Sequence, residues 1–481
     1  MFRMNSRRIL AGLMVISIAG CSSSATPTPA APSAESSMAA SAAPSAEASM
    51  AASAAPTPVA AAPVKFSYQT FVAKEADQVG SCIDAYEKLN PNVTIDYQIV
   101  DEAALQQKLV TMAQTGTLPD MFWWNGQQIV DAYNQTPSSI LDLTPYYDAA
   151  FKGSLVVGAT DLMTTKDGKI VGFPANMEIQ GWVFNKALWD KYGLAIPKTI
   201  DDLKAAVPVF KQNGIATIAY GSKEGWAVCG FQHWLELWGV WQQAKAVFLD
   251  HSLKAVDADF QHAYQTEAEL HALGAFPANN ATMSFDQAVS LFNSGKAAMI
   301  TLPSDQLGKI IGQPNEKDYI LNWGITFPAS PYPQNVKVRD VGNGYGISAK
   351  AAADPAKLDA IIAFNKWRYS QAGFDCALKV GSIMPAKLTP PAGLGPIMTQ
   401  QVALIQDTSI DTTINHGLNS DYAPYMMAWN SNGDLFTQGF ANIRGPLENG
   451  LMNGSLTAKD IPIELAKMDK AIDAVIAQLP K

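Results

Sequence analysis

The sequence predicts an α/β fold made of two α/β regions, which follow an N-terminal leader and a tether. Residues 64–123 alternate between strand-like and helix-like hydrophobic patterns in the order β-α-β-α-β. A second α/β pattern begins after Pro197, and about 418 residues remain beyond position 63, enough for two ordinary domains. Since β-α-β units form parallel sheets with right-handed crossovers, each region is expected to hold a mainly parallel sheet flanked by helices.

The N-terminus has the pattern of a cleaved export signal. Three arginines precede the apolar stretch 9–19, which is too short to span a bilayer. The run Ile-Ala-Gly-Cys at 18–21 resembles a bacterial lipobox. This resemblance implies that residues 1–20 are removed and that Cys21 is lipidated, which anchors the protein to the outer side of the cell membrane.

Residues 21–63 form the predicted tether. Beyond Cys21 they are almost entirely Ala, Ser, Pro, Thr, Met and Glu, and the unit 33–44 is repeated with little change at 45–56. Large side chains are lacking, so burial cannot offset the entropy of ordering. A flexible tether is expected.

The first α/β region contains three strands and two helices with regular hydrophobic spacing. Gly116 is a plausible stop for the second helix. In order, the elements are a strand at 64–71, a helix over 79–89, a strand at 93–100, a helix over 105–112 and a strand at 120–123. Ligands of parallel sheets lie beyond the carboxyl ends of the strands, so one rim should carry a polar and aromatic set. This set is Lys74, Glu75, Trp124, Asn125, Gln127 and Gln128.

The second α/β region opens with Thr199 and Asp202, whose spacing resembles a capping box. Strands are expected at 215–220, 297–300 and 323–327. The apolar segment 231–248 carries Trp234, Trp238 and Trp241 on one helical face, which favours a core position. A final amphipathic helix, over 463–479, is expected to be capped by Thr457 and Asp460.

Composition narrows the possible partners. The formal charge is −9, and removal of the leader makes it more negative because three arginines and no acids are lost, so nucleic acid is excluded as an expected partner. Only Arg339, Arg368 and Arg444 then remain. A phosphate or carboxylate site usually recruits arginine, so a neutral ligand fits better, although genome composition explains the scarcity equally well.

Cysteine and histidine usage indicates neither a metal site nor a cofactor. Besides Cys21 the chain has Cys82, Cys229 and Cys376, and a Cys82–Cys376 disulfide and buried free thiols both stay open. No zinc-site spacing and no HExxH occur, and neither a P-loop nor GxSxG is present. We therefore expect no metal, no cofactor and no catalytic residue.

Several segments, in this order along the chain, resemble the extracellular solute-binding proteins of bacterial ABC importers, in the sugar-binding group. They are 118–124 with 141–144, 172–174 with Glu178 and 184–186, 192–194 with 197–199, 292–299 and 453–457. The resemblance implies a two-lobed periplasmic-binding-protein-like fold of type II, with hinge crossings near 176–179, 328–340 and 386–392. Lobe 1 would combine 64–177 with 336–388, and lobe 2 would combine 178–335 with 389–481.

The resemblance also implies ligand-contacting residues. A sugar needs flat aromatic rings for its C–H faces and carboxylates or amides for its hydroxyls. Trp124 is the first candidate, with Trp123 pointing into the core, and a packing role is the less favoured alternative for Trp124. Glu178 would accept hydroxyl hydrogen bonds or else form a hinge salt bridge. The further candidates are Glu224 with Trp226, Asp305, Asn343 and Tyr345 in a glycine-rich segment expected to turn tightly, and Trp429; core packing is equally open for Tyr345.

The function implied is that of a lipid-anchored, monomeric substrate-binding component that captures a carbohydrate and delivers it to the permease subunits of an importer. Gln127 and Gln128 replace a charged pair of the family, and Ser304 and Asp305 stand where it has a stacking tryptophan, which argues against maltodextrin. A polyamine or other small cation is an alternative ligand, since aromatic and carboxylate groups bind cations. A secreted glycoside hydrolase using Glu178, Glu224 or Asp305 is the enzyme alternative.

Overall fold

The computed structural model describes residues 62–221, 223, 247, 251–257, 259–322, 325–330, 339–340, 342–406 and 445–476. The described residues from 62 onward belong to one compact unit. The predicted leader, Cys21 and all but the last two residues of the tether lie outside the described residues.

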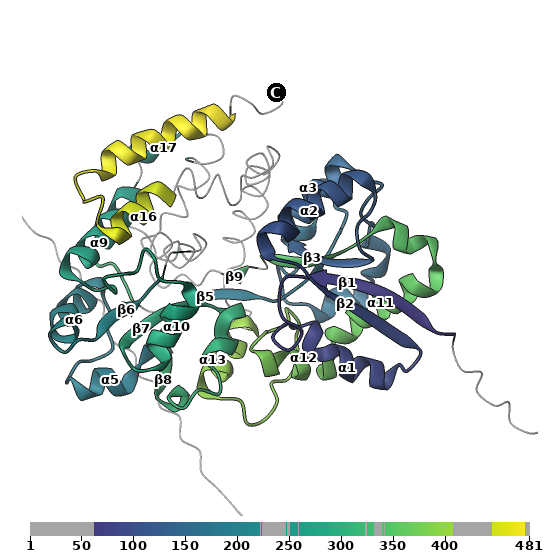
Figure 1. Cartoon of the computed structure of the whole chain (residues 1–481), viewed down its shortest axis with the longest axis horizontal. Coiled ribbons are helices and arrows are strands. Elements are labelled where there is room, and N and C mark those ends of the chain that lie inside the picture. Colours follow the sequence, from purple (N-terminus) through teal and green to yellow (C-terminus); the bar gives the residue numbers. More distant parts are fainter. Residues whose placement is uncertain are drawn as a thin grey trace, which may run out of the picture. The chain divides into compact units, whose positions relative to one another are not determined.

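The first sheet has the strand order β2-β1-β3-β10-β4. Strands β1, β2 and β3 are labelled in Figure 1. Strand β1 pairs in parallel with β2 and β3, whereas β10 runs antiparallel between β3 and β4. The bounds are β1 Val64–Thr70, β2 Val93–Ile99, β3 Met121–Asn125, β4 Phe173–Pro174 and β10 Asn343–Ile347. The predicted β-α-β-α-β order of residues 64–123 is confirmed.

The two helices that the hydrophobic spacing predicts are present, as α1 Gly80–Leu89 and α2 Glu102–Thr115. Asp101 caps α2 by accepting from the Ala104 amide, and Gly116 ends it with a left-handed φ of 67°, a conformation that glycine adopts without strain. The helices are α1 Gly80–Leu89, α2 Glu102–Thr115, α3 Gly126–Gln135, α4 Ala149–Ser154, α11 Pro355–Arg368 and α12 Gln371–Ala377.

The second sheet has the order β6-β7-β5-β8, and β9 pairs with β5 outside this path. Among its described strands, only β6 and β7 pair in parallel, because β5 runs antiparallel to both β7 and β8. The bounds are β5 Glu178–Asn185, β6 Ala216–Ala219, β7 Ala297–Pro303, β8 Tyr319–Asn322 and β9 Arg339–Asp340. The α/β class with two sheets is confirmed, but mainly parallel pairing holds only for the β1–β3 set and for β6 with β7.

Two helices of the second region begin at capping boxes. Both hydrogen bonds of the predicted Thr199–Asp202 capping box are formed, and Ser284 with Gln287 makes another box. The helices are α5 Lys186–Lys191, α6 Ile200–Gln212, α9 Phe260–Leu273, α10 Phe285–Asn293, α13 Pro396–Gln406, α16 Gly445–Asn453 and α17 Ile461–Ile476.

Three sequence predictions for the second region have different outcomes. The strand expected at 323–327 is wrong for its described part, where Thr326 makes only an isolated bridge with Thr199. Asp460 accepts from the amide and hydroxyl of Thr457 and directly precedes α17, as the predicted cap requires. The predicted tryptophan-rich helix at 231–248 lies outside the described residues apart from Val247.

The glycine-rich segment 342–346 forms β10 and not the tight turn that its glycines suggest. A Cβ at Gly346 would lie 2.4 Å from the Phe122 ring, and one at Gly344 would lie 2.5 Å from the Met163 side chain. These glycines are two positions apart and so lie on one face of a central strand, where they serve close packing against neighbouring side chains. The turn interpretation is wrong because the glycines make room for neighbours and do not supply positive φ angles.

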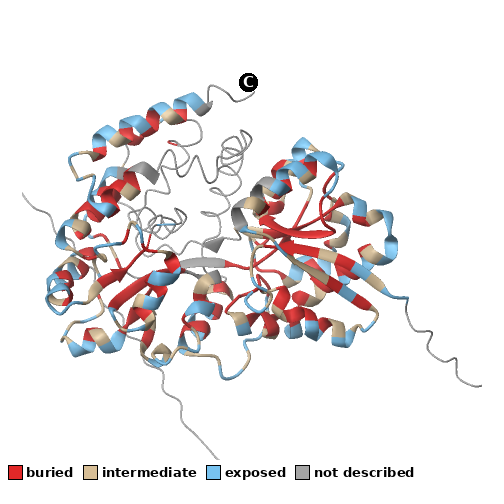
Figure 2. Cartoon of the chain, in the orientation of Figure 1, coloured by how far each residue is buried: buried red, intermediate tan, exposed pale blue. Residues whose placement is uncertain are grey.

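Many apolar residues of both sheets are buried. In Figure 2 much of the described strand ribbon is coloured as buried, whereas the helices carry exposed residues as well. Trp182 and Trp189 are among the largest fully buried side chains of the second region. In the first region a disulfide joins Cys82 on α1 to Cys376 on α12, with the two Cα atoms 5.7 Å apart. This bond resolves the question that cysteine spacing left open.

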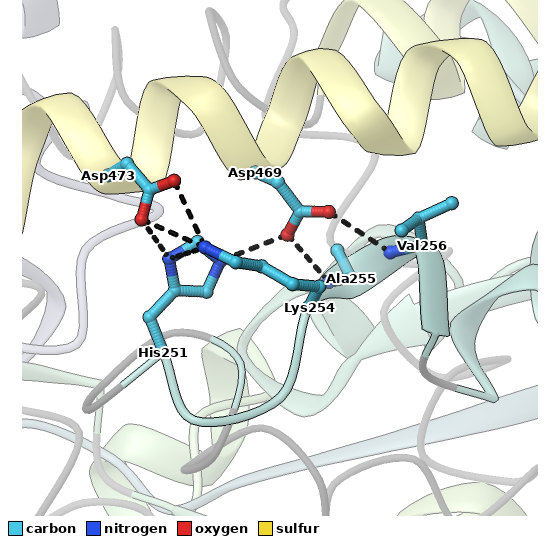
Figure 3. A network of polar contacts seen from close by, with 6 residues as sticks. All are labelled: His251, Lys254, Ala255, Val256, Asp469 and Asp473. Atoms are coloured by element: carbon cyan, nitrogen blue, oxygen red, sulfur yellow. Dashed lines mark hydrogen bonds and ion pairs between the residues drawn. The ribbon is translucent and has the colours of Figure 1, made fainter.

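Helix α17 is held to the segment 251–257 by a polar network (Figure 3). Asp469 accepts from the amides of Ala255 at 2.6 Å and Val256 at 3.2 Å, and it contacts His251 Nε2 at 2.9 Å. Asp473, one turn further along, contacts His251 Nδ1 at 2.7 Å and Lys254 Nζ at 3.0 Å. Asp469 is buried, whereas the Asp473 side chain is 58% exposed.

We expect Asp469→Ala to lower the free energy of unfolding by about 2–3 kcal/mol, because it leaves the buried amide of Ala255 and the part-buried amide of Val256 without an acceptor. Asp473→Ala is the matched control on the same helix, and its loss should be much smaller because solvent screens that carboxylate. Urea unfolding followed by circular dichroism measures both. Equal losses for the two variants would contradict the assignment of the main role to Asp469.

Candidate functional site

The segments that follow β1 and β3 meet at one edge of the first sheet. The two strands are parallel, so their carboxyl ends, at Thr70 and Asn125, share that edge. Phe71, directly after β1, packs edge-on against Trp123 of β3 with 4.7 Å between ring centroids. An aromatic contact thus joins the two segments at this edge, where the sequence predicts the rim.

Amide side chains gather at this edge. Asn125 Nδ2 donates to Gln128 Oε1 at 3.0 Å, and Asn343 of β10 stands opposite Asn125 in the strand register. The Gly126 amide donates to Gly342 O at 3.0 Å, which continues the contact between the two chain segments beyond the strands. Three predicted ligand residues, Asn125, Gln128 and Asn343, are thus brought together by the β3–β10 pairing.

The connection from β4 to β5 passes the same edge. The Ala175 amide donates to Asn343 O, and the Met177 amide donates to Ile383 O, both at 2.9 Å. Between them, Asn176 is 2% exposed, and its Nδ2 atom has no hydrogen-bond partner among the described residues. Sequence reasoning missed Asn176; its position two residues before Glu178, at the expected hinge crossing, is the signal that could have found it.

This group of amides determines what the site can do chemically. Each amide offers both a donor and an acceptor, so the set can match the hydroxyls of a neutral ligand without introducing charge. A buried amide that lacks a partner also carries a desolvation cost, which a ligand hydroxyl would remove. The edge is suited to recognition by hydrogen bonds.

Lys74 and Glu75 lie on the segment between β1 and α1, as the rim prediction requires. Lys74 Nζ forms an ion pair with Asp84 of α1 at 2.7 Å, and Glu75 is exposed. The ammonium of Lys74 is therefore neutralised within the first region. Their contact with a ligand stays a prediction.

The two tryptophans of β3 are both buried. Trp124 is 1% exposed and lies beside Phe122, with 6.2 Å between ring centroids, while Trp123 is 9% exposed and faces Phe71. Trp123 is thus the one that joins the rim contact. The predicted ligand contact of Trp124 stays a prediction, and its burial adds a packing role.

Tyr345 is fully buried in β10. Its ring lies 5.8 Å from that of Tyr68, and the Arg368 guanidinium carbon stands 4.3 Å from the ring centroid. Burial raises the pKa of Tyr345 above its ordinary value, and the nearby Arg368 opposes that shift. The structure supplies the core-packing role that the sequence left open.

The remaining candidates fall into two groups. Glu224, Trp226 and Trp429 lie outside the described residues. For Gln127, Glu178 and Asp305 the backbone is described: Gln127 lies in α3, Glu178 opens β5 opposite Asp340, and Asp305 lies in the short 3-10 helix Ser304–Lys309. Their roles stay predictions.

Neither a metal centre nor a membrane span is found in the described part of the chain. There, no group of three or more His, Cys, Asp or Glu side chains is arranged to hold a metal ion. The helices described are each too short or too polar to cross a bilayer.

Comparison with curated proteins finds relatives that share part of their length with this chain. A binding protein of Brucella abortus (strain 2308) is 28% identical over 163 residues, which are 34% of this chain and 39% of the relative. MelE of Bacillus subtilis (strain 168), a melibiose/raffinose/stachyose-binding protein, is 24% identical over 144 residues, 30% of this chain and 32% of the relative. The chain spans about two fifths or less of these relatives.

Solved structures match over nearly the whole folded part. A chitin oligosaccharide binding protein is 19% identical with a TM-score of 0.68, covering 86% of this chain and 99% of its own. Maltose-bound MalE3 of T. maritima is 18% identical with a TM-score of 0.63, covering 85% and 99%. These structures show that the fold is the two-lobed one expected from the motifs. Residues 67–373 match the model of the bacterial extracellular solute-binding proteins, and this chain is a member of that family.

Proposed function

We propose that this chain is the substrate-binding component of an ABC importer and captures a mono- or oligosaccharide. The amide side chains at the edge of the first sheet carry the proposal, because Asn125, Gln128, Asn343 and Asn176 can bind hydroxyls, and Asn176 Nδ2 has no partner among the described residues. Related proteins are named for melibiose, raffinose, stachyose and chitin oligosaccharide, which supports a carbohydrate ligand.

The proposal includes the cellular setting and the lobes. Signal cleavage before Cys21 and lipidation there would hold the protein at the membrane, and the tether 21–63 would keep it near its permease at a high local concentration. Residues 64–177 with 336–388 and residues 178–335 with 389–481 would be the two lobes that close on the sugar, and closure would be what the permease reads. The protein would act as a monomer and release its ligand unchanged.

A ligand panel tests this function. We expect the chain carrying Cys21→Ser, which cannot be acylated, to bind at least one neutral sugar with a rise in melting temperature and a change in tryptophan fluorescence. Asn125→Ala should weaken that binding roughly tenfold by removing a hydrogen-bonding amide. Asn92→Ala is the matched control, because Asn92 precedes β2 at the opposite end of the sheet.

The panel also contains the results that would overturn the proposal. Stabilisation by spermidine and by no sugar would assign the site to cations. Chromatographic detection of shortened glycosides after incubation would show an enzyme. Equal affinity of the Asn125→Ala and Asn92→Ala variants for the sugar would remove the amide edge from the site.

A further inference from the structure

The segment 71–79, between β1 and α1, is folded tightly against the first sheet. The amides of Ala76 and Asp77 both donate to Ala73 O at 2.9 Å. A Cβ at position 80 would lie 2.5 Å from Lys74 O and 2.7 Å from the Tyr97 ring, so only glycine lets the segment lie where it does. The geometry of Phe71, Lys74 and Glu75 at the rim therefore depends on contacts beneath them.

Tyr97 of β2 makes the central contact beneath this segment. Its Oη atom lies 2.8 Å from Val72 O and 2.9 Å from Asp77 Oδ2. A phenol carries one proton, while a backbone carbonyl and an ionised carboxylate only accept hydrogen bonds. With Asp77 ionised, the single proton of Tyr97 would have to be shared between two acceptors.

A protonated Asp77 satisfies every atom in this arrangement. Its Oδ2 hydroxyl then donates to Tyr97 Oη, and Tyr97 donates its own proton to Val72 O. The same Oδ2 atom can still accept from the Gly80 amide, which lies 3.2 Å away. The result is a chain of hydrogen bonds that runs from the start of α1 through β2 to the backbone of Val72.

The surroundings of Asp77 favour the neutral form. Asp77 is 4% exposed, and burial raises the pKa of its carboxyl above the ordinary value, although the hydrogen bonds from Tyr97 and nearby amides and the charge of Arg368 oppose the shift. Tyr97, Tyr68, Tyr345 and Arg368 face it from β2, β1, β10 and α11. Of these, only Arg368 is a cation, and it stacks on the Tyr345 ring.

We propose that protonated Asp77, acting through Tyr97, is the positioning residue that holds the segment carrying Phe71, Lys74 and Glu75 in its ligand-binding geometry. The inference rests on the proposed function for the identity of the ligand. The hydrogen-bonded chain from Asp77 through Tyr97 to Val72, here called the clamp, can be measured without a ligand. Asp77 would act through Tyr97 and Val72 and would not touch the ligand.

The clamp should depend on pH in a definite direction. A raised carboxyl pKa means that the stability contributed by the protonated form is complete below the unfolded value of about 3.9 and is lost as pH rises through the folded value. Affinity for the ligand should therefore fall as Asp77 ionises. Asp77→Asn, whose amide can donate to Tyr97 without a titrating proton, should remove this dependence.

Calorimetric titration of the sugar that the panel identifies gives the first test. The titrations run from about pH 5 to about pH 9. At the low end of this range, Asp77→Ala and Tyr97→Phe should bind the sugar roughly 3- to 10-fold more weakly than the parent. Asp77→Asn should recover most of the loss and flatten the pH profile. Asp96→Asn is the matched control, because Asp96 precedes Tyr97 on β2 and pairs with Lys65 at the exposed side.

Hydrogen exchange of the backbone amides of 72–78, without ligand, gives the second test. Exchange should be roughly 3- to 10-fold faster in Asp77→Ala and Tyr97→Phe and unchanged in Asp96→Asn. The clamp would be contradicted if Asp77→Ala and Tyr97→Phe kept the exchange rates and the sugar affinity of the parent. It would also be contradicted if Asp77→Asn lost as much affinity as Asp77→Ala. Altered exchange together with no binding of any sugar would instead reject the proposed function.

Discussion

Opening the Cys82–Cys376 disulfide is expected to lower the free energy of unfolding by about 2–5 kcal/mol. The bond closes a loop with a sequence separation of 294 residues and ties α1 to α12. A crosslink over so long a loop removes many conformations from the unfolded chain, and the 5.7 Å between Cα atoms lies within the range of native disulfides. Urea unfolding with and without dithiothreitol measures the loss.

The Cys82→Ala/Cys376→Ala double variant provides the control for this experiment. It should be destabilised to a similar extent and should then be indifferent to reductant. Because both sulfurs are buried, thiol titration must confirm that the parent was reduced. An unchanged unfolding midpoint in a chain shown to be fully reduced would contradict the prediction.

Trp124→Ala is expected to lower the free energy of unfolding by about 3–5 kcal/mol, because it removes a large ring that is 1% exposed and leaves a cavity. Gly344 stands opposite Trp124 in the β3–β10 register, so β10 has no side chain there that could fill the space. Thermal and urea unfolding measure the change. Trp124→Phe should retain much of the stability, since a phenyl ring fills part of the volume.

Binding by the folded fraction of Trp124→Ala decides its second role. If sugar binding by Trp124→Ala is weaker than the unfolded fraction of the variant accounts for, the ligand contact predicted from the sequence is supported. Stability close to that of the parent would contradict the packing role. Trp123→Ala provides the comparison, because that ring packs against Phe71 at the rim.

Local patterns were sufficient to predict elements whose determinants are close in sequence. The alternation in β1 and β2, the stop at Gly116 and the capping box at Thr199 and Asp202 each depend on residues a few positions apart. These predictions are confirmed because backbone propensity and side-chain caps act within one turn of helix or one strand.

Predictions failed where a distant segment supplies the reason for a residue. The glycines at 344 and 346 look like turn residues, but Met163 and Phe122 require their missing side chains. Likewise, the expected mainly parallel sheets are interrupted because β10 and β5 enter antiparallel to their neighbours. Pairing over such separations leaves no periodic mark in the local sequence.

The candidate site divides in the same way. Residues after β1 and β3 could be placed at one edge from strand order alone, since parallel strands end together. Three other features could not be predicted from strand order. They are the pairing of Asn343 with Asn125, the burial of Asn176 and the Asp77–Tyr97 clamp. Each depends on which atoms another segment brings within hydrogen-bond distance.

By itself, the sequence determined the α/β class, the family and the rim at the ends of β1 and β3, because order, spacing and local caps encode them. Only the tertiary structure decided that Cys82 is bonded to Cys376 and that Trp124 is buried. It also decided that the Tyr97 hydroxyl lies within hydrogen-bond distance of both Val72 O and Asp77 Oδ2. These outcomes depend on ångström-scale distances between segments far apart in the chain, and burial then sets the cost of every polar atom left unpaired.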